Sequence, residues 1–98
     1  LQSRYPHFKD FLVGVTNSKS DIDETLANFM ERDISSLDPI ERNTLRLAAY
    51  EMLFTETDVP IIINESIRLT KKYGSADGHK YVNAVLDKMY KSKFEKTE

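Results

Sequence analysis

Residues 63–74, I-N-E-S-I-R-L-T-K-K-Y-G, and residues 79–88, H-K-Y-V-N-A-V-L-D-K, decide the fold of this chain, with the turn S-A-D-G between them. The first block is amphipathic, since its basic residues at positions 68, 71 and 72 share one helical face, and it ends at a glycine. In and just beyond the second block, one apolar face at helical spacing is formed by Val82, Val85, Leu86 and Met89. The stretch therefore predicts two helices joined by a short glycine-containing turn.

Upstream of this pair, the spacing of apolar residues predicts further helices. Apolar residues recur three and four positions apart over residues 8–15 and predict a helix that ends near Asn17. The next apolar stripe covers residues 22–30, and we expect Ser20 to be the N-cap of its helix. Residues 32–37 show no clear period, so we expect them to form a connection.

The helix with the clearest start signal follows Asp38. Asp38 is the expected N-cap, Pro39 fits the first helical position, and Glu41 is placed to complete a capping box at the third. Residues 45–54 are almost all apolar, which is typical of a central helix buried on several sides. Arg46 falls inside this apolar run and therefore needs a carboxylate or carbonyl partner.

The remaining segments complete an all-α prediction with about five helices. Pro60 is expected to help open the fourth helix, although the three isoleucines after it are β-branched and could also be read as a strand. A lone three-residue strand has no partner in this sequence, so we expect a helix there. Residues 91–98 are expected to be a flexible tail, and residues 1–98 a single domain.

Size and composition limit the class of protein. Ninety-eight residues make one domain near the small end of what buries an adequate core alone. The absence of cysteine excludes disulfides and thiolate metal sites and is compatible with the reducing cytoplasm, where we expect the protein to act. No apolar run is long enough to cross a bilayer, so we expect no membrane association.

The formal net charge of −2 conceals an asymmetry along the chain. Residues 1–67 contain six Lys and Arg against twelve Asp and Glu, whereas residues 68–98 contain eight basic residues against four acidic ones. Because only charge within about 10 Å acts strongly at ordinary salt, such a basic end can bind nucleic acid. The alternative is that these lysines only solvate a C-terminal helix and tail.

Residues expected of an enzyme are nearly absent. The two histidines, His7 and His79, are far apart in sequence, and no H-E-x-x-H, P-loop, G-x-S-x-G or dinucleotide-binding glycine pattern occurs. Asp77 lies close to His79, but a capping carboxylate and a surface imidazole are the more ordinary interpretation. We therefore predict a protein that is not an enzyme and uses no cofactor or metal.

The last predicted helix carries residues suited to single-stranded RNA. Lys80, Lys88 and Lys91 fall within one broad helical face, Tyr81 adjoins Lys80, and Asp77 precedes Tyr81 by one turn. Lysines hold phosphates and aromatic rings stack on bases, while a nearby carboxylate accepts base amino protons or repels the backbone. Taken alone, Tyr81 is more often a half-buried packing residue.

The ordered blocks at 63–88 closely resemble the C-terminal signature of the NusB family of antitermination factors. The segments F-K-D-F-L-V-G-V at 8–15 and P-I-E-R-N-T-L-R-L-A-A-Y-E-M-L-F at 39–54 are similar to two further helices of that family. The resemblance implies an all-helical NusB-like bundle that recognises the boxA element of nascent ribosomal RNA. It also implies a protein partner, the small-subunit ribosomal protein NusE, within an RNA polymerase antitermination complex.

The resemblance also suggests roles for individual residues. Asp77 and Tyr81 match RNA-facing positions of the family, with Lys80 expected beside them, and Glu41 matches a position implicated in holding the protein partner. A capping role for Glu41 is compatible with that. Four further matches to the family pattern are expected to serve mainly in internal hydrogen bonding: Arg46, Asn64, Glu65 and Asn83.

Two departures from the family pattern carry expectations of their own. Residues 58–64 are fewer than expected, so the start of the fourth helix is expected to differ. Family members usually begin with two further helices, the first rich in arginine and central to RNA binding, so we expect this chain to be a C-terminal portion. We then expect exposed apolar surface, a homodimer, and weaker RNA binding than that of an intact member.

Two other functions remain open from the sequence. The chain could be the NusB-like RNA-binding module of a ribosomal-RNA methyltransferase, whose enzyme part would then follow residue 98. It could also be a helical interaction domain without RNA binding, in which case changing Lys80 and Tyr81 would leave every measurable activity unchanged.

Overall fold

The computed structural model describes residues 8–94, and the side chains of residues 13–93. Its elements are α1 (Phe8–Asn17), α2 (Lys19–Ala27), the 3₁₀ helix η1 (Ile34–Ser36), α3 (Pro39–Phe54), α4 (Val59–Tyr73) and α5 (Gly78–Phe94). Residues 8–94 contain no strand, and the prediction of an all-α bundle with about five helices is confirmed. None of these helices is both long enough and apolar enough to cross a membrane.

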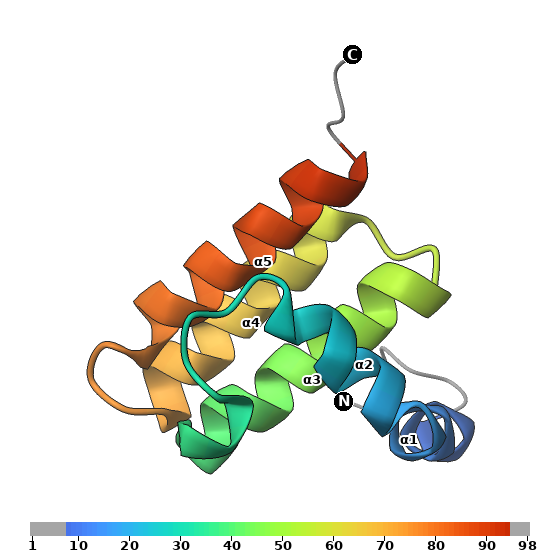
Figure 1. The fold of residues 1–98 in the computed structure, drawn as a ribbon, viewed down its shortest axis with the longest axis horizontal. Coiled ribbons are helices and arrows are strands. Elements are labelled where there is room, and N and C mark those ends of the chain that lie inside the picture. Colours follow the sequence, from blue (N-terminus) through green and yellow to red (C-terminus); the bar gives the residue numbers. More distant parts are fainter. Residues whose placement is uncertain (1–7, 95–98) are drawn as a thin grey trace.

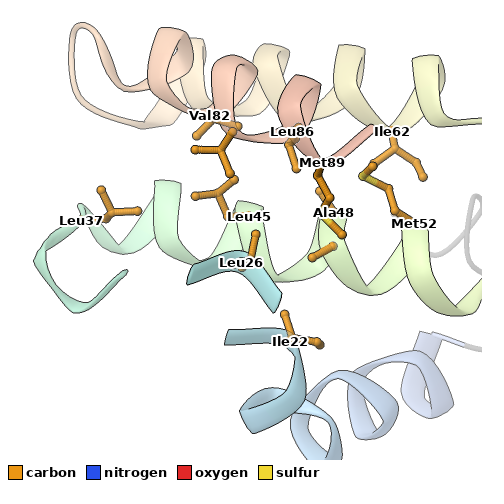
Figure 2. Close-up of a cluster of buried hydrophobic side chains, with 12 residues drawn as sticks. Ile22, Leu26, Leu37, Leu45, Ala48, Met52, Ile62, Val82, Leu86 and Met89 are labelled. Carbon is orange, nitrogen blue, oxygen red and sulfur yellow. The ribbon is translucent and has the colours of Figure 1, made fainter. Parts of the chain in front are cut away.

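Helix α3 is the centre of the molecule, as its apolar sequence predicted. Figure 1 shows α4 and α5 side by side above α3, α2 crossing in front of α3, and α1 at one end. Figure 2 shows buried side chains of α5 pointing toward α3, and those of α2 approaching α3 from the other side. The helix is therefore covered by partners on two sides, which is why so many of its residues are apolar.

One apolar core joins these helices. Helix α5 contributes the apolar face that the sequence predicted. Leu45 and Ala49 of α3 belong to the same core and are completely buried. Its α1 part is represented by Val15, while Phe8, Phe11 and Leu12 of the same predicted stripe lie outside the described side chains. The buried apolar residues are Ile22, Leu26, Leu37, Leu45, Ala48, Ala49, Met52, Ile62, Val82, Val85, Leu86 and Met89.

The start of α2 differs from the sequence prediction. Ser20 was predicted to be its N-cap, but it lies inside the helix, and Ser18 occupies the cap position without a side-chain hydrogen bond. The reason is that α1 runs almost directly into α2. The Ser18 N–H donates to the Gly14 carbonyl at 3.0 Å, and the Ser18 carbonyl accepts from the Ile22 N–H at 2.9 Å. Both backbone groups are thereby satisfied without a capping side chain.

Two other helix ends also differ from their predicted positions. Helix α2 ends at Ala27, although the apolar stripe continues to Met30, and Phe29 and Met30 pack against the core from the following turn. Helix α5 extends to Phe94, past the point at residue 91 where we expected a tail. The three isoleucines near the start of α4 are helical, as predicted, with Pro60 in the first turn.

Arg46 has the carboxylate partner that its position required. Its Nε donates to Asp23 Oδ1 and its Nη2 to Asp23 Oδ2, both at 2.9 Å, so the pair is bidentate. The side chains are only 15% and 26% exposed. Because Asp23 lies on α2 and Arg46 on α3, the pair fixes how α2 crosses the central helix.

Several large apolar side chains remain exposed, namely Val13, Ile40, Phe54, Ile61 and Tyr73. Exposed apolar atoms are the kind of surface that self-association would bury. The homodimer remains a prediction.

We predict that Arg46→Ala lowers the free energy of unfolding by about 1–3 kcal/mol, because two charge-assisted hydrogen bonds are lost and Asp23 is left without its partner. Urea denaturation followed by circular dichroism measures this change. Arg68→Ala is the matched control, since the Arg68–Glu65 pair is exposed and its atoms are 4.0 Å apart. Its expected cost is below about 0.5 kcal/mol, and equal costs for the two variants would contradict a special role for the Asp23–Arg46 pair.

Candidate nucleic-acid interface

A buried carboxylate organises the turn that precedes α5. Glu41, near the start of α3, is only 3% exposed. Its Oε2 accepts a hydrogen bond from the Ser75 N–H at 2.8 Å and another from the Ser75 hydroxyl at 2.5 Å. A buried carboxylate needs such donors, and the start of α5 adds the favourable end of a helix dipole. Glu41 thereby ties the start of the central helix to the α4–α5 connection.

The predicted capping box is therefore only half present. Asp38 caps α3 as predicted, accepting from the Ile40 N–H at 2.8 Å. Glu41 turns away from that end and bonds Ser75, 34 positions further along the chain. Sequence spacing could not reveal this partner, because capping patterns describe only neighbours within a helical turn.

The two glycines around the turn provide space for this carboxylate. A Cβ at Gly78 would collide with the Glu41 carboxylate. A Cβ at Gly74 would lie 2.8 Å from the Thr70 carbonyl oxygen and 3.0 Å from Glu41 Oε2. Gly74 ends α4 in an extended conformation, with φ of −91° and ψ of −168°, so close approach explains this glycine and a left-handed backbone does not.

The predicted RNA-facing residues follow directly from this turn. Asp77 immediately precedes α5, and Lys80 and Tyr81 lie in its first turn. Lys80 Nζ is 3.6 Å from Asp77 Oδ1, and both side chains are largely exposed, at 74% and 82%. Such an exposed pair is weak, so the lysine can exchange its carboxylate partner for a phosphate at little cost.

Tyr81 is half-buried and held from a distant part of the chain. Its ring packs against the core, and its Oη accepts a hydrogen bond from the Arg32 backbone N–H at 3.2 Å. The Arg32 guanidinium also lies over the ring, with Cζ 5.5 Å from the centroid. The packing role that the sequence left open for Tyr81 is therefore real, and it leaves the ring in contact with a cation at the surface.

Arg32 is a residue of this site that the sequence interpretation missed. It lies in the connection before η1, where no period marks it, and it is separated from Tyr81 by 49 positions. Nothing in the sequence signals the contact, because only the crossing of α2 over α3 brings the connection to α5.

The other predicted basic residues lie further along α5. Lys88 is exposed, and Lys91 Nζ is 3.2 Å from Asp87 Oδ2. At the end of α4, Lys72 Nζ lies 5.4 Å from the centroid of the exposed Tyr73 ring. Cations beside aromatic rings thus occur on both sides of the turn that Glu41 holds.

Three more residues that were expected to form internal hydrogen bonds, Asn64, Glu65 and Asn83, differ in how far they are buried. Asn64 and Asn83 are exposed, so the prediction of an internal role is wrong for them. They lie on the outward sides of α4 and α5, where water satisfies an amide. Glu65 is half-buried, with its Oε2 4.0 Å from Arg68 Nη2.

The described part of the chain contains no cluster of three His, Cys, Asp or Glu side chains of the kind that holds a metal ion. His79 Nδ1 is buried and has no hydrogen-bond partner there, and His7 lies outside the described residues. The geometry at the start of α5 suits binding through an aromatic ring and cations.

Comparison with known proteins identifies relatives of this arrangement. A sequence model of the NusB family matches residues 2–91. The chain is 46% identical over 85 residues to the transcription antitermination protein NusB of Shewanella piezotolerans, which covers 85% of this chain and 62% of that protein.

Proteins of the same name from two other bacteria give similar values. The protein of Pseudomonas savastanoi pv. phaseolicola is 47% identical over 85 residues, or 85% of this chain and 51% of that protein. The protein of Methylobacillus flagellatus is 46% identical over 87 residues, or 87% of this chain and 56% of that protein. The chain thus spans between 51% and 62% of the length of these relatives. No solved structure matches it significantly.

We predict that Gly78→Ala lowers the free energy of unfolding by about 1–3 kcal/mol, because the new methyl group displaces the Glu41 carboxylate from its Ser75 donors. The same substitution in a Glu41→Ala background should cost much less, since the obstacle is gone and alanine favours the helix. Urea denaturation of the four proteins in this cycle measures the coupling. Additive effects would show that Glu41 does not set the space at Gly78.

Proposed function

Because the chain belongs to the NusB family, we propose that it is a transcription antitermination factor. In this proposal it binds the boxA element of nascent ribosomal RNA together with NusE, within an RNA polymerase antitermination complex. The observation that carries the proposal is the start of α5, where Asp77, Lys80 and Tyr81 come together beside Arg32.

Each of these residues suits a different part of a single-stranded RNA. Tyr81 is half-buried, and the part of its ring that stays exposed offers a surface against which an unpaired base can pack. Lys80 supplies an exposed charge for a phosphate, and the Asp77 carboxylate can accept a hydrogen bond from a base amino group. Asp77 also pairs with Lys80, so binding of a phosphate by Lys80 would exchange one ion pair for another.

The charge distribution agrees with such a site. The chain has a net charge of −2, but residues 68–98 carry eight basic residues and four acidic ones. Exposed lysines at 71, 72, 80 and 88 belong to this part of the chain. Because charges separated by more than about 10 Å are screened at ordinary salt, only the acidic residues close to these lysines oppose their effect.

Glu41 is proposed to support the protein partner. Its burial and its hydrogen bonds to Ser75 mean that its carboxylate shapes the surface through the turn. The partner would then contact residues of the turn, and the RNA would contact the start of α5 beside it. This arrangement would explain how one protein surface makes RNA and partner binding mutually favourable.

The proposal is tested by titrating the protein with fluorescently labelled boxA RNA and with a shuffled RNA of the same composition. Titrations with and without purified NusE, at two salt concentrations, complete the design. We expect tighter binding to boxA, strengthened by NusE. Equal, strongly salt-dependent binding to both RNAs would reduce the site to a non-specific basic patch and overturn the proposal.

We predict that Tyr81→Ala lowers boxA affinity by about 5- to 100-fold, the equivalent of one lost base stack of about 1–3 kcal/mol. Tyr81→Phe is the matched control, because it keeps the ring and removes only the oxygen that accepts from Arg32. Fluorescence anisotropy measures both. Equal losses in the two variants would assign the effect to the hydrogen bond and contradict stacking.

We predict that Lys80→Glu also weakens boxA binding and lowers the slope of log affinity against log salt by about one unit. Lys19→Glu, on the exposed start of α2, makes the same change of charge away from α5. The control is expected to bind nearly as the unchanged protein does. Equal effects of the two variants would mean that net charge, and not the position of Lys80, governs binding.

For Glu41, we predict that Glu41→Ala weakens NusE binding because it removes both hydrogen bonds that shape the turn. Ser75→Ala should weaken it less, because the backbone N–H at position 75 still donates to Glu41. Affinity for NusE is measured by isothermal titration calorimetry, and circular dichroism verifies that both variants are folded. Unchanged NusE affinity in folded Glu41→Ala would contradict a role for this contact in partner binding.

A further inference from the structure

We propose that Arg32 is a further RNA-contacting residue, which offers the plane of its guanidinium group to an unpaired base as the outer layer of a stack on Tyr81. The inference rests on the proposed RNA-binding function and adds to it a residue on a different element. Arg32 comes from the connection before η1, whereas the other proposed contacts belong to the turn and α5.

The guanidinium is held in place from two directions. Its Cζ lies 5.5 Å from the Tyr81 ring centroid, within the range of a cation–π contact. Its Nη2 donates to the Ser36 carbonyl at 3.3 Å, and the Arg32 backbone N–H donates to Tyr81 Oη at 3.2 Å. Arg32 is nevertheless exposed, so its side chain is accessible from solvent.

Arg32 lies among acidic residues, yet its guanidinium contacts the Tyr81 ring and the Ser36 carbonyl. Arg32 itself lines an open groove of about 640 Å³ together with five acidic residues, Asp21, Asp23, Glu24, Glu31 and Asp33. None of the ion pairs among the described side chains joins one of these carboxylates to Arg32. The guanidinium lies over an aromatic ring instead, where its charge and its plane stay available to a ligand.

Two of those carboxylates are occupied by other donors. Asp23 is paired with Arg46. Asp33 Oδ1 accepts from both the N–H and the hydroxyl of Ser35, and these hydrogen bonds hold the pKa of Asp33 below its ordinary value, the backbone bond contributing most. Both carboxylates therefore have hydrogen-bond donors other than Arg32.

The acidic groove also limits where an RNA strand can run. Its carboxylates repel phosphates, whereas Lys80 and Lys88 on α5 attract them. The backbone of a bound strand is thus favoured on the α5 side of Arg32. A base pointing from that side toward the groove would meet the guanidinium group, a planar cation of the kind that stacks on bases.

The chemistry defines the ligand class as single-stranded RNA with at least one unstacked base at this position. The guanidinium is already oriented by Tyr81 and Ser36, so little rotamer freedom is lost when the base arrives. A lysine at this position would keep the charge but would lose the planar surface.

The test uses boxA RNA in which single bases are replaced in turn by the fluorescent base 2-aminopurine, whose emission falls on stacking. Affinity and emission are measured for the unchanged protein, Arg32→Ala, Arg32→Lys and the matched control Arg68→Ala, an exposed arginine on α4. Urea denaturation verifies that each variant is folded. All variants at position 32 keep the backbone N–H that bonds Tyr81.

We expect Arg32→Ala to weaken boxA binding about tenfold and to relieve quenching at one base, as the loss of one stack predicts. Arg32→Lys should also relieve that quenching, and Arg68→Ala should leave it unchanged. Two results would overturn the inference while leaving the proposed function intact. One is affinity within about twofold for Arg32→Ala while Tyr81→Ala still impairs binding. The other is full recovery of affinity and quenching by Arg32→Lys, which would show that charge alone matters.

One further result would overturn the proposed function itself. If the unchanged protein does not distinguish boxA from the shuffled RNA, the proposed function fails, and the role of Arg32 in it fails as well.

Discussion

The buried carboxylate of Glu41 is the constraint on which the arrangement of the proposed site depends. It needs donors, and it receives them from Ser75 in the α4–α5 turn. The turn can reach the carboxylate only because a glycine stands at each side of it. This contact between the start of α3 and the start of α5 sets the positions from which Asp77, Lys80 and Tyr81 project.

A second constraint acts where α2 crosses α3. The bidentate Asp23–Arg46 pair fixes α2 on the central helix, and the chain leaving α2 then carries Arg32 to Tyr81. Two polar contacts of α3, one at its first turn and one near its middle, thus bring together segments that meet at the candidate interface. The apolar core supplies most of the stability, and these pairs determine the placement of surface residues.

The sequence predicted those features that depend on neighbours along the chain. Apolar spacing located the helices and the buried face of α5, the Asp-Pro pair located the start of α3, and the apolar surroundings of Arg46 required a partner. It did not predict the Glu41–Ser75 or Arg32–Tyr81 contacts, which span 34 and 49 positions. The Ser20 cap failed because a nearly continuous α1–α2 backbone made a capping side chain unnecessary.

The proposed interface combines two surfaces of opposite charge, and this determines how an RNA strand is oriented on it. Arg32 lines a groove together with five acidic residues, whereas exposed lysines belong to α5, the helix that carries Tyr81. A phosphate backbone is repelled by the first surface and attracted by the second, whereas an uncharged base is excluded by neither. A weakly acidic protein can therefore orient an RNA strand as well as attract it, because the carboxylates that oppose non-specific binding also restrict where the backbone lies.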